Sequence, residues 1–307
     1  MMGRRNALKT AMAVGMTPIV GACERQPSSA SEGRESQTGR AGMSDRSTRG
    51  TEVLPAIFVA HGSPMLIDDA PWNTELAGWA AGMPRPASIL AISAHWVDRP
   101  VTLSATRTLP LFYDFYGFPK KYYEIDYRAP GAPELAGRVR QALSASWTVA
   151  DDPERGLDHG TYIPLLAMVP DADIPVLQMS IPGMDPAELI ELGRKLAPLR
   201  REGVLVMGSG FLTHNMRAID LRPDAQVPSW ASEFDAWVAD ALRRRDVDAL
   251  LTYRERGPGV REALPTHEHF VPVLVALGAS LDESEGVAFP IEGFTYGSFT
   301  KRSVQFG

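Results

Sequence analysis

Cysteine is almost absent from this chain of 307 residues, and Cys23 is the only one. A single cysteine cannot form an internal disulfide or a paired-cysteine zinc module, so the fold must depend on its hydrophobic core. Excess positive charge is also lacking. The formal net charge is -6, and no stripe of Lys and Arg runs through the part expected to fold. This charge balance argues against a nucleic-acid partner.

Several short catalytic motifs are missing as well. The sequence has no His-Glu-x-x-His, so any metal ligands must come from distant parts of the chain. Gly-x-Ser-x-Gly is absent too, because Met207 occupies the first glycine position around Ser209. Gly208-Ser209-Gly210 fits no dinucleotide-binding or P-loop fingerprint. We therefore expect Ser63, Ser209 and their neighbouring glycines to form turns at a sheet edge.

Residues 1–23 have the pattern of an export signal. A basic start with paired arginines precedes the apolar stretch 11–22, which is too short to span a bilayer, and small residues precede Cys23. The segment resembles a twin-arginine signal joined to a lipoprotein cleavage site. It predicts a periplasmic or membrane-tethered protein that touches the membrane only through a lipidated Cys23. The alternative is a cytoplasmic protein whose translation starts at Met43.

Two further segments follow. Residues 24–50 are rich in Ser, Gly, Arg and Glu and have almost no large apolar side chain, which predicts a flexible tether. Residues 51–307 have no evident internal repeat or second domain boundary, so we expect one catalytic domain there.

Apolar runs of strand length alternate with helical spacing through this domain. Strands are expected at 56–60, 88–94, 101–105, 175–180, 203–208, 287–291 and 303–306, and helices at 71–82, 133–146, 163–168, 185–200, 229–245 and 270–277. The aromatic-rich stretch 112–127 is expected to be a packed loop. The alternation predicts an α/β fold, a single domain with a largely parallel or mixed central sheet flanked by helices.

The six histidines all lie at ends or breaks of these elements: His61, His95, His159, His214, His267 and His269. His61, His95 and His214 each come after an expected strand. Parallel strands bring their carboxyl ends to one edge of a sheet. Neutral imidazole binds both zinc and iron, so the pattern predicts a shared metal site.

A set of short motifs occurs in order from about Leu54 to the C-terminus. The motifs include His61-Gly62-Ser63-Pro64, Ser93-Ala94-His95-Trp96, Gly117-Phe118-Pro119, Asp158-His159-Gly160, His214-Asn215 and Pro265-Thr266-x-Glu268-His269. As a set they resemble the 4,5-DOPA extradiol dioxygenase family. These are class III extradiol enzymes, related to the protocatechuate 4,5-dioxygenase β subunit.

The resemblance implies a role for each matching position. His61, His95 and His269 match three metal ligands, whereas Glu268 is a lesser candidate because a glutamate is the third ligand in the protocatechuate branch. His214 matches a histidine that serves in acid–base catalysis or as a fourth ligand.

Other positions are implied around the substrate. His159 matches a catalytic histidine of the pocket wall, and Trp96, Tyr162 and Phe118 are implied to bind substrate. His267 stands where the family would have proline. It is either an adventitious ligand or a surface imidazole.

The implied activity is ring opening of a small catechol-type, DOPA-like aromatic by O2 at a non-haem Fe(II) centre. Zn(II) could occupy the same nitrogens, and a homo-oligomer is a further expectation. Two alternatives stay open at this point: a zinc-dependent hydrolase on the same scaffold, and a metal-binding lipoprotein without turnover.

Overall fold

The computed structural model describes residues 53–222, 224–281 and 286–307. The predicted export signal, the lipidation site Cys23 and the tether at 24–50 lie outside the described residues. Within the described ranges, no helix is long and apolar enough to cross a membrane.

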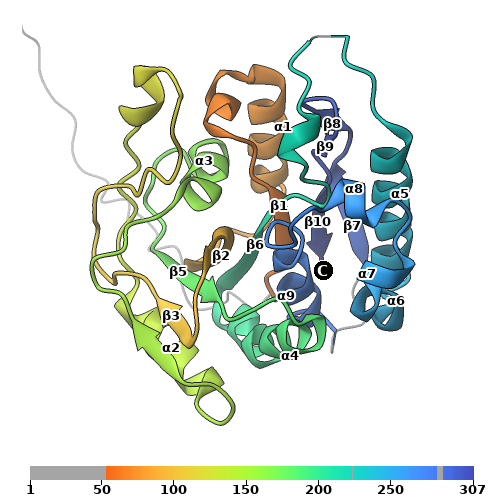
Figure 1. Ribbon diagram of the computed structural model, residues 1–307. Coiled ribbons are helices and arrows are strands. Elements are labelled where there is room, and N and C mark those ends of the chain that lie inside the picture. The colour runs from red at the N-terminus through yellow and green to blue at the C-terminus, as the bar shows by residue number, and fades with distance from the viewer. Residues whose placement is uncertain (1–52, 223, 282–285) are drawn as a thin grey trace, which may run out of the picture. The chain divides into compact units, whose positions relative to one another are not determined.

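A mixed eight-stranded sheet forms the centre of the domain, with strand order β4-β3-β5-β2-β6-β1-β10-β7 (Figure 1). Its strands are β1 (Ala56–Ala60), β2 (Ser88–Val97), β3 (Val101–Leu103), β4 (Val149–Asp151), β5 (Val176–Ile181), β6 (Val204–Gly210), β7 (Val287–Ile291) and β10 (Ser303–Phe306). The central strands β5, β2, β6 and β1 run parallel, whereas β3–β5, β1–β10 and β10–β7 pair antiparallel. The predicted α/β fold with a mixed sheet is confirmed.

Helices cover both faces of this sheet because alternate residues of each buried strand point to opposite sides. Ile57 and Val59 of β1 share a core with α1 (Ala70–Ala81) and α3 (His159–Met168). Ala56 and Phe58 share the other core with α2 (Pro133–Leu143), α4 (Pro186–Leu196) and α9 (Pro272–Gly278). The same core includes residues of α5 (Ser229–Arg243), α6 (Val247–Leu251), α7 (Tyr253–Arg256) and α8 (Val260–Ala263).

Smaller elements complete the domain. They are the two-stranded sheet β8 (Phe294–Thr295) and β9 (Phe299–Thr300), and the 3₁₀ turns η1 (Pro64–Asp68), η2 (Lys120–Tyr123), η3 (Ala197–Glu202) and η4 (Met216–Ala218). Apart from η2, residues 112–127 form an irregular segment, as predicted.

Element boundaries at His95 and His159 differ from expectation. β2 continues to Val97, so His95 lies within the strand and not after it. α3 begins at His159, four residues before the expected start at 163, because the Asp158 side chain accepts a hydrogen bond from the backbone N–H of Thr161.

The prediction that 208–210 forms a turn is wrong, since β6 continues through Gly210. The glycines there serve close packing. A Cβ atom at Gly208 would lie 2.4 Å from the Pro272 carbonyl oxygen, and one at Gly210 would lie 1.9 Å from that of His269. The segment that carries His269 can therefore lie directly against β6.

Candidate metal centre

Three parallel strands deliver histidines to one edge of the sheet. His61 directly follows β1, His95 lies near the end of β2, and His214 follows β6. Ser93 of β2 and Val59 of β1 both align with Ser209 of β6, so the three strands end side by side. The shared edge that the sequence predicts is present.

The imidazoles of His61, His95 and His269 converge at this edge. Their nitrogens lie within 4.8 Å of one another, a spacing at which the three could hold a metal ion. The Nε2 atoms of His61 and His95 are 3.2 Å apart. That separation is compatible with both nitrogens binding one ion, because bonds from imidazole nitrogen to zinc are about 2.0–2.1 Å long.

The hydrogen bonds of His61 fix which of its nitrogens carries the proton. The hydroxyl of Ser209 donates to the carbonyl oxygen of Gly160, which can only accept. The Ser209 Oγ, 2.9 Å from His61 Nδ1, must therefore accept a hydrogen bond from that nitrogen. His61 is protonated at Nδ1, and its Nε2 presents a lone pair to the cluster.

Carboxylates also face the Nδ1 atoms of the other two imidazoles. His269 Nδ1 lies 3.1 Å from Glu268 Oε1, and His95 Nδ1 lies 3.2 Å from Asp114 Oδ2. A carboxylate can only accept, so the hydrogen bond to Glu268 places the proton of His269 on Nδ1. Such outer partners orient histidines that ligate metals.

The buried cluster is neutral near pH 7. Burial, followed by the neighbouring imidazoles, holds the pKa of His61 and of His269 well below the usual value. Burial and His159 also lower the pKa of His95, to about 3, although Asp114 and Glu268 act in the opposite direction. Three neutral imidazoles therefore converge at one point, and a metal cation fits this donor set.

His159 adjoins the cluster from the start of α3. Its Nδ1 donates to Asp114 Oδ1 at 2.8 Å, its backbone N–H donates to the same oxygen at 3.1 Å, and its ring centroid is 3.9 Å from that of His95. A side chain at Gly160 would collide with this arrangement, because its Cβ would lie 2.4 Å from Ser93 Oγ and 3.0 Å from His95 Cδ2.

His214 stacks on the cluster from the other side. Its ring is nearly parallel to that of His269, at 6°, and the centroids are 3.5 Å apart. Burial lowers the pKa of His214 to about 4, with a smaller contribution from His159 and against the pull of Glu268. The ring is therefore neutral at pH 7 and able to accept a proton.

Glu268 and His267 are not among the three converging imidazoles, although Glu268 belongs to a second metal-capable group with His214 and His269. Glu268 Oε1 accepts hydrogen bonds from His269 Nδ1 and from the Thr266 hydroxyl, which places this carboxylate on the outer side of the imidazole. His267 packs edge-on against Tyr253, at 5.5 Å between ring centroids, and belongs to none of the metal-capable groups within the described residues.

An apolar cavity of about 550 Å³ opens onto the histidines. Phe118, which the resemblance implied, lines it together with Phe115. Trp96 and Tyr162 do not. Trp96 points to the opposite face of β2 from His95 and packs under the Arg155 guanidinium, at 4.3 Å. Tyr162, a residue of α3, is fully buried in the core.

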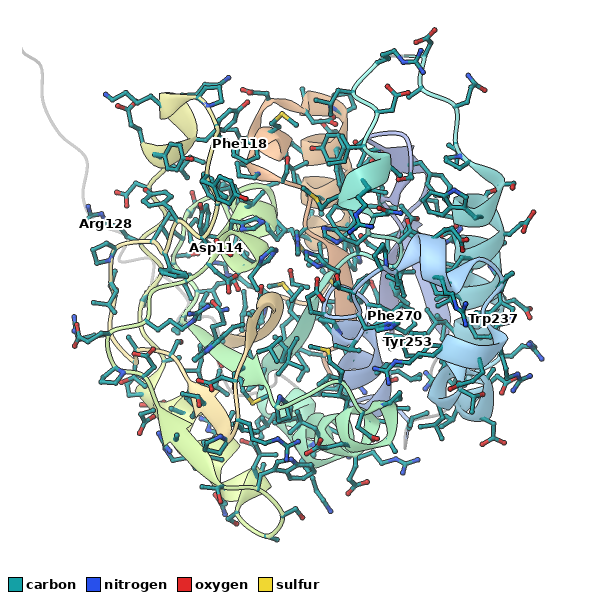
Figure 2. All side chains as sticks on the ribbon, viewed as in Figure 1. Asp114, Phe118, Arg128, Trp237, Tyr253 and Phe270 are labelled. Atoms are coloured by element: carbon teal, nitrogen blue, oxygen red, sulfur yellow. The ribbon has the colours of Figure 1, made fainter. Side chains whose placement is uncertain are left out.

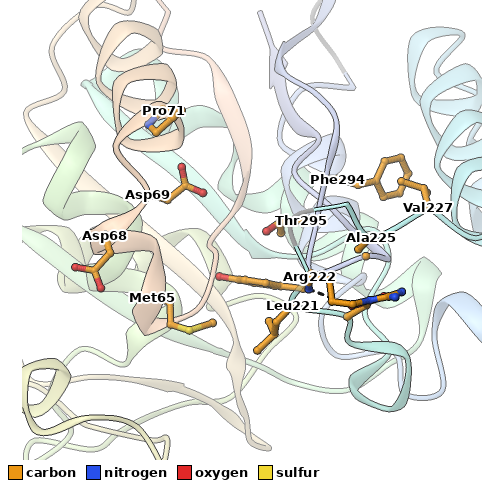
Figure 3. Close-up of a pocket in the computed structure, with 13 residues that line it drawn as sticks. Met65, Asp68, Asp69, Pro71, Leu221, Arg222, Ala225, Val227, Phe294 and Thr295 are labelled. Carbon is orange, nitrogen blue, oxygen red and sulfur yellow. Dashed lines mark hydrogen bonds and ion pairs between the residues drawn. The ribbon is translucent and has the colours of Figure 1, made fainter.

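A second cavity adjoins the first and shares Met65, Leu221 and Tyr296 with it. Figure 3 shows Asp68 and Asp69 on one of its walls and Arg222 on the opposite wall. Asp220 pairs with Arg222 at 2.6 Å, and Asp68 pairs with Lys121 at 2.6 Å. These charged groups already have partners.

Sequence reasoning did not single out Asp114 or the role of Ser209. Asp114 is the only acidic residue among the aromatics of 112–118, and a carboxylate in such company must find donors if it is buried. That signal was available. Ser209 gave no comparable signal, because its role depends on the register of β6 against β1.

Comparisons with known proteins agree with this arrangement. The family model for the catalytic LigB subunit of aromatic ring-opening dioxygenase matches residues 55–307. The 4,5-DOPA dioxygenase extradiol of Escherichia coli K12 is 38% identical over 83% of this chain and 95% of its own length, and that of Beta vulgaris is 40% identical over 76% and 89%. The crystal structure of an uncharacterized protein from Escherichia coli K12 superposes with a TM-score of 0.71 and 35% identity, covering 83% of this chain and all of that one. The chain therefore belongs to the LigB family of extradiol aromatic ring-opening dioxygenases.

Proposed function

We propose that this protein is a non-haem Fe(II)-dependent extradiol dioxygenase, which uses O2 to open the ring of a catechol-type aromatic. One observation carries the proposal: three neutral imidazoles converge, with nitrogens within 4.8 Å of one another, and the Nδ1 atom of each faces a separate oxygen. Family membership supports the class of reaction. The metal and the substrate are our inference.

His61, His95 and His269 would hold the metal. Three protein ligands leave other coordination positions free, and Fe(II) held there would bind both catechol oxygens and make the reaction of the ring with O2 accessible. Phe115 and Phe118 lie in the cavity wall, where they can pack against an aromatic ring and orient it.

His214 and His159 would handle protons. Ring opening requires that phenolic protons leave the catechol and that a proton later returns. His214 is neutral, and its ring lines the cavity beside His269, so it can accept a phenolic proton. The Nδ1 proton of His159 is committed to Asp114, so its Nε2 is free to accept or share a proton.

Anaerobic reconstitution tests the proposal. The purified protein is loaded with Fe(II), mixed with a panel of catechols and exposed to air, while O2 uptake and the absorbance of a yellow ring-opened product are recorded. We expect uptake that matches product formation for at least one catechol. No uptake across the panel would refute the proposal, and ester hydrolysis by the Zn(II)-loaded protein would favour the hydrolase.

We also propose export and lipid tethering through Cys23, on the grounds of the signal-like residues 1–23. The test is incorporation of a labelled lipid precursor in the natural host. We expect label in the wild-type protein and none in Cys23→Ser. An unlabelled wild-type protein that stays in the cytoplasm would instead support the start at Met43.

A further inference from the structure

One carboxylate lies between two histidines of the site. Asp114 Oδ1 accepts from the side chain and the backbone N–H of His159, at 2.8 and 3.1 Å, and its Oδ2 lies 3.2 Å from His95 Nδ1. Oδ2 is buried and makes no well-aligned hydrogen bond in the described structure, so the His95 imidazole is the group that faces it. Figure 2 labels Asp114 on the irregular segment that also carries Phe118.

The carboxylate provides what two Nδ1–H groups require. A carboxylate has two oxygens that only accept, so it can face one N–H with each. An asparagine side chain has one accepting oxygen and one donating NH₂ group. Only one of the two imidazoles could then keep its partner, and the other would face a donor.

We propose that Asp114 is a positioning residue that holds His95 and His159 in the Nδ1–H tautomer through separate oxygens, leaving Nε2 of His95 free for the metal and Nε2 of His159 free for the substrate side. His95 depends on this contact for its orientation, as His61 depends on Ser209 and His269 on Glu268. Partners of this kind typically change metal affinity by about 10- to 100-fold when they are removed.

The same residue connects the cavity wall to the metal ligands. Phe115, directly after Asp114, and Phe118 line the cavity. The backbone of Phe112, two residues before, donates to the Leu157 carbonyl at 2.8 Å and bridges to Asp158, the N-cap of α3. Asp114 therefore fixes the aromatic wall to both imidazoles.

Zinc binding by the full chain tests the inference without use of the oxygen reaction. Zn(II) affinity and stoichiometry are measured by competition with a chromophoric chelator, and histidine tautomers are read from long-range ¹⁵N NMR of the Zn(II)-loaded protein. The variant is Asp114→Asn. Asp126→Asn is the matched control, since Asp126 lies on the same segment but is exposed and pairs with Arg128.

For Asp114→Asn we expect affinity about 10- to 100-fold lower. In this variant we expect His95, and not His159, to lose its Nδ1–H signal, because the Nδ1–oxygen distance is longer for His95, 3.2 Å against 2.8 Å. Asp126→Asn should match the wild type. If Asp114→Asn does not fold, Asp114→Glu, which keeps two accepting oxygens, should bind zinc more tightly than Asp114→Ala.

Four results would overturn the inference. Asp114→Asn could keep the zinc affinity and the histidine tautomers of the wild type, or the Glu and Ala variants could bind zinc equally well. Asp126→Asn could lose as much zinc affinity as Asp114→Asn, or the wild type could bind a second zinc ion that Asp114→Asn lacks. The last result would make Asp114 a ligand. The inference rests on the proposed metal site, and a wild-type protein that binds no zinc or iron would refute that site instead.

Discussion

An imidazole binds a metal through a nitrogen that carries no proton, so the placement of the other proton decides whether a histidine can be a ligand. In this chain Ser209 and Glu268 accept hydrogen bonds from Nδ1 of two of the imidazoles, and Asp114 faces Nδ1 of the third. The partners of the Nδ1 atoms therefore matter for metal binding as much as the histidines themselves. Ser209 in particular has the appearance of a hydrolase serine but acts as an acceptor for His61.

Removal of a ligand imidazole should abolish tight metal binding. We expect His61→Ala or His269→Ala to lower bound iron or zinc to near zero after gel filtration, because each takes one of three converging nitrogens. His267→Ala is the control, since this ring packs against Tyr253 outside the cluster. Metal content by mass spectrometry measures the difference, and equal loss in His267→Ala would contradict the assignment.

The neutral buried imidazoles should make the metal-free protein sensitive to acid. The pKa of His214 is lowered from 6.5 to about 4 on folding, so between these values the unfolded chain binds a proton that the folded chain does not. The free energy of unfolding should therefore fall as the pH drops below 6.5, by up to about 2 kcal/mol for this group at pH 5.

Urea unfolding of the metal-free protein at pH 7 and pH 5 measures this loss. His214→Gln removes the titrating group, so its decrease between the two pH values should be smaller than that of the wild type. An equal decrease in both proteins would show that His214 is not held neutral by burial.

At the scale of elements, the site depends on how closely the segment before α9 approaches β6. The backbone N–H of Phe211 donates to the His269 carbonyl at 2.9 Å, and the glycine at 210 leaves room for that contact. His269, a proposed metal ligand, is thereby fixed to the strand that neighbours both β1 and β2.

Gly210→Ala should displace this segment and weaken metal binding. Its Cβ would lie 1.9 Å from the His269 carbonyl oxygen, so the backbone of His269 must move. Gly137→Ala, in α2, is the matched control because no atom lies within 4 Å of its added Cβ. Zinc competition compares the two variants. Unchanged affinity in Gly210→Ala would mean that the segment can shift without loss of the ligand.

The elements themselves were largely predictable from the sequence. Runs such as 56–60 and 203–208 have the length and apolar content of buried parallel strands, and the periodicity at 71–82 and 229–245 predicted α1 and α5. Boundaries near the site were predicted less accurately. β6 continues through 208–210, where its glycines pack against the backbone of His269 and Pro272, which are distant in the sequence.

At the scale of the whole domain, the histidines at the sheet edge were predictable from the sequence. The carboxylate contacts that complete the site were not. Parallel strands bring their carboxyl ends to one edge of a sheet, and this rule predicted that His61, His95 and His214 would lie together. The contacts of Asp114 with two histidines depend on the path of an irregular segment, which no periodicity describes. Trp96 and Tyr162, by contrast, lie in β2 and α3, and the faces of these elements turn both side chains away from the cavity in which they were expected.

A buried ion pair joins α5 to the C-terminal strands. Arg302 contacts both oxygens of Asp235, at 2.8 and 2.7 Å, and the Thr300 hydroxyl donates to the same carboxylate. Asp235→Ala should lower the free energy of unfolding by up to about 3–5 kcal/mol, because the buried guanidinium of Arg302 loses the carboxylate that binds it through both oxygens and keeps only Glu292 as an acidic partner among the described residues.

The control for this pair is Asp173→Ala. Asp173 pairs with Arg85 at the surface, where both side chains are more than half exposed, so the expected change is about 0–1 kcal/mol. Denaturant unfolding distinguishes the two variants. Similar values for both would contradict the structural role given to the buried pair.

Isotopic labelling of O2 tests the central claim most directly. The Fe(II)-loaded protein turns over a catechol that supports O2 uptake, under ¹⁸O₂, and the ring-opened product is analysed at once by mass spectrometry. An extradiol dioxygenase inserts both atoms of one O2 molecule, so we expect a product that carries two labels before exchange with water. A ring-opened product without label would contradict the account. So would a labelled product that still forms when His61, His95 or His269 is replaced by alanine.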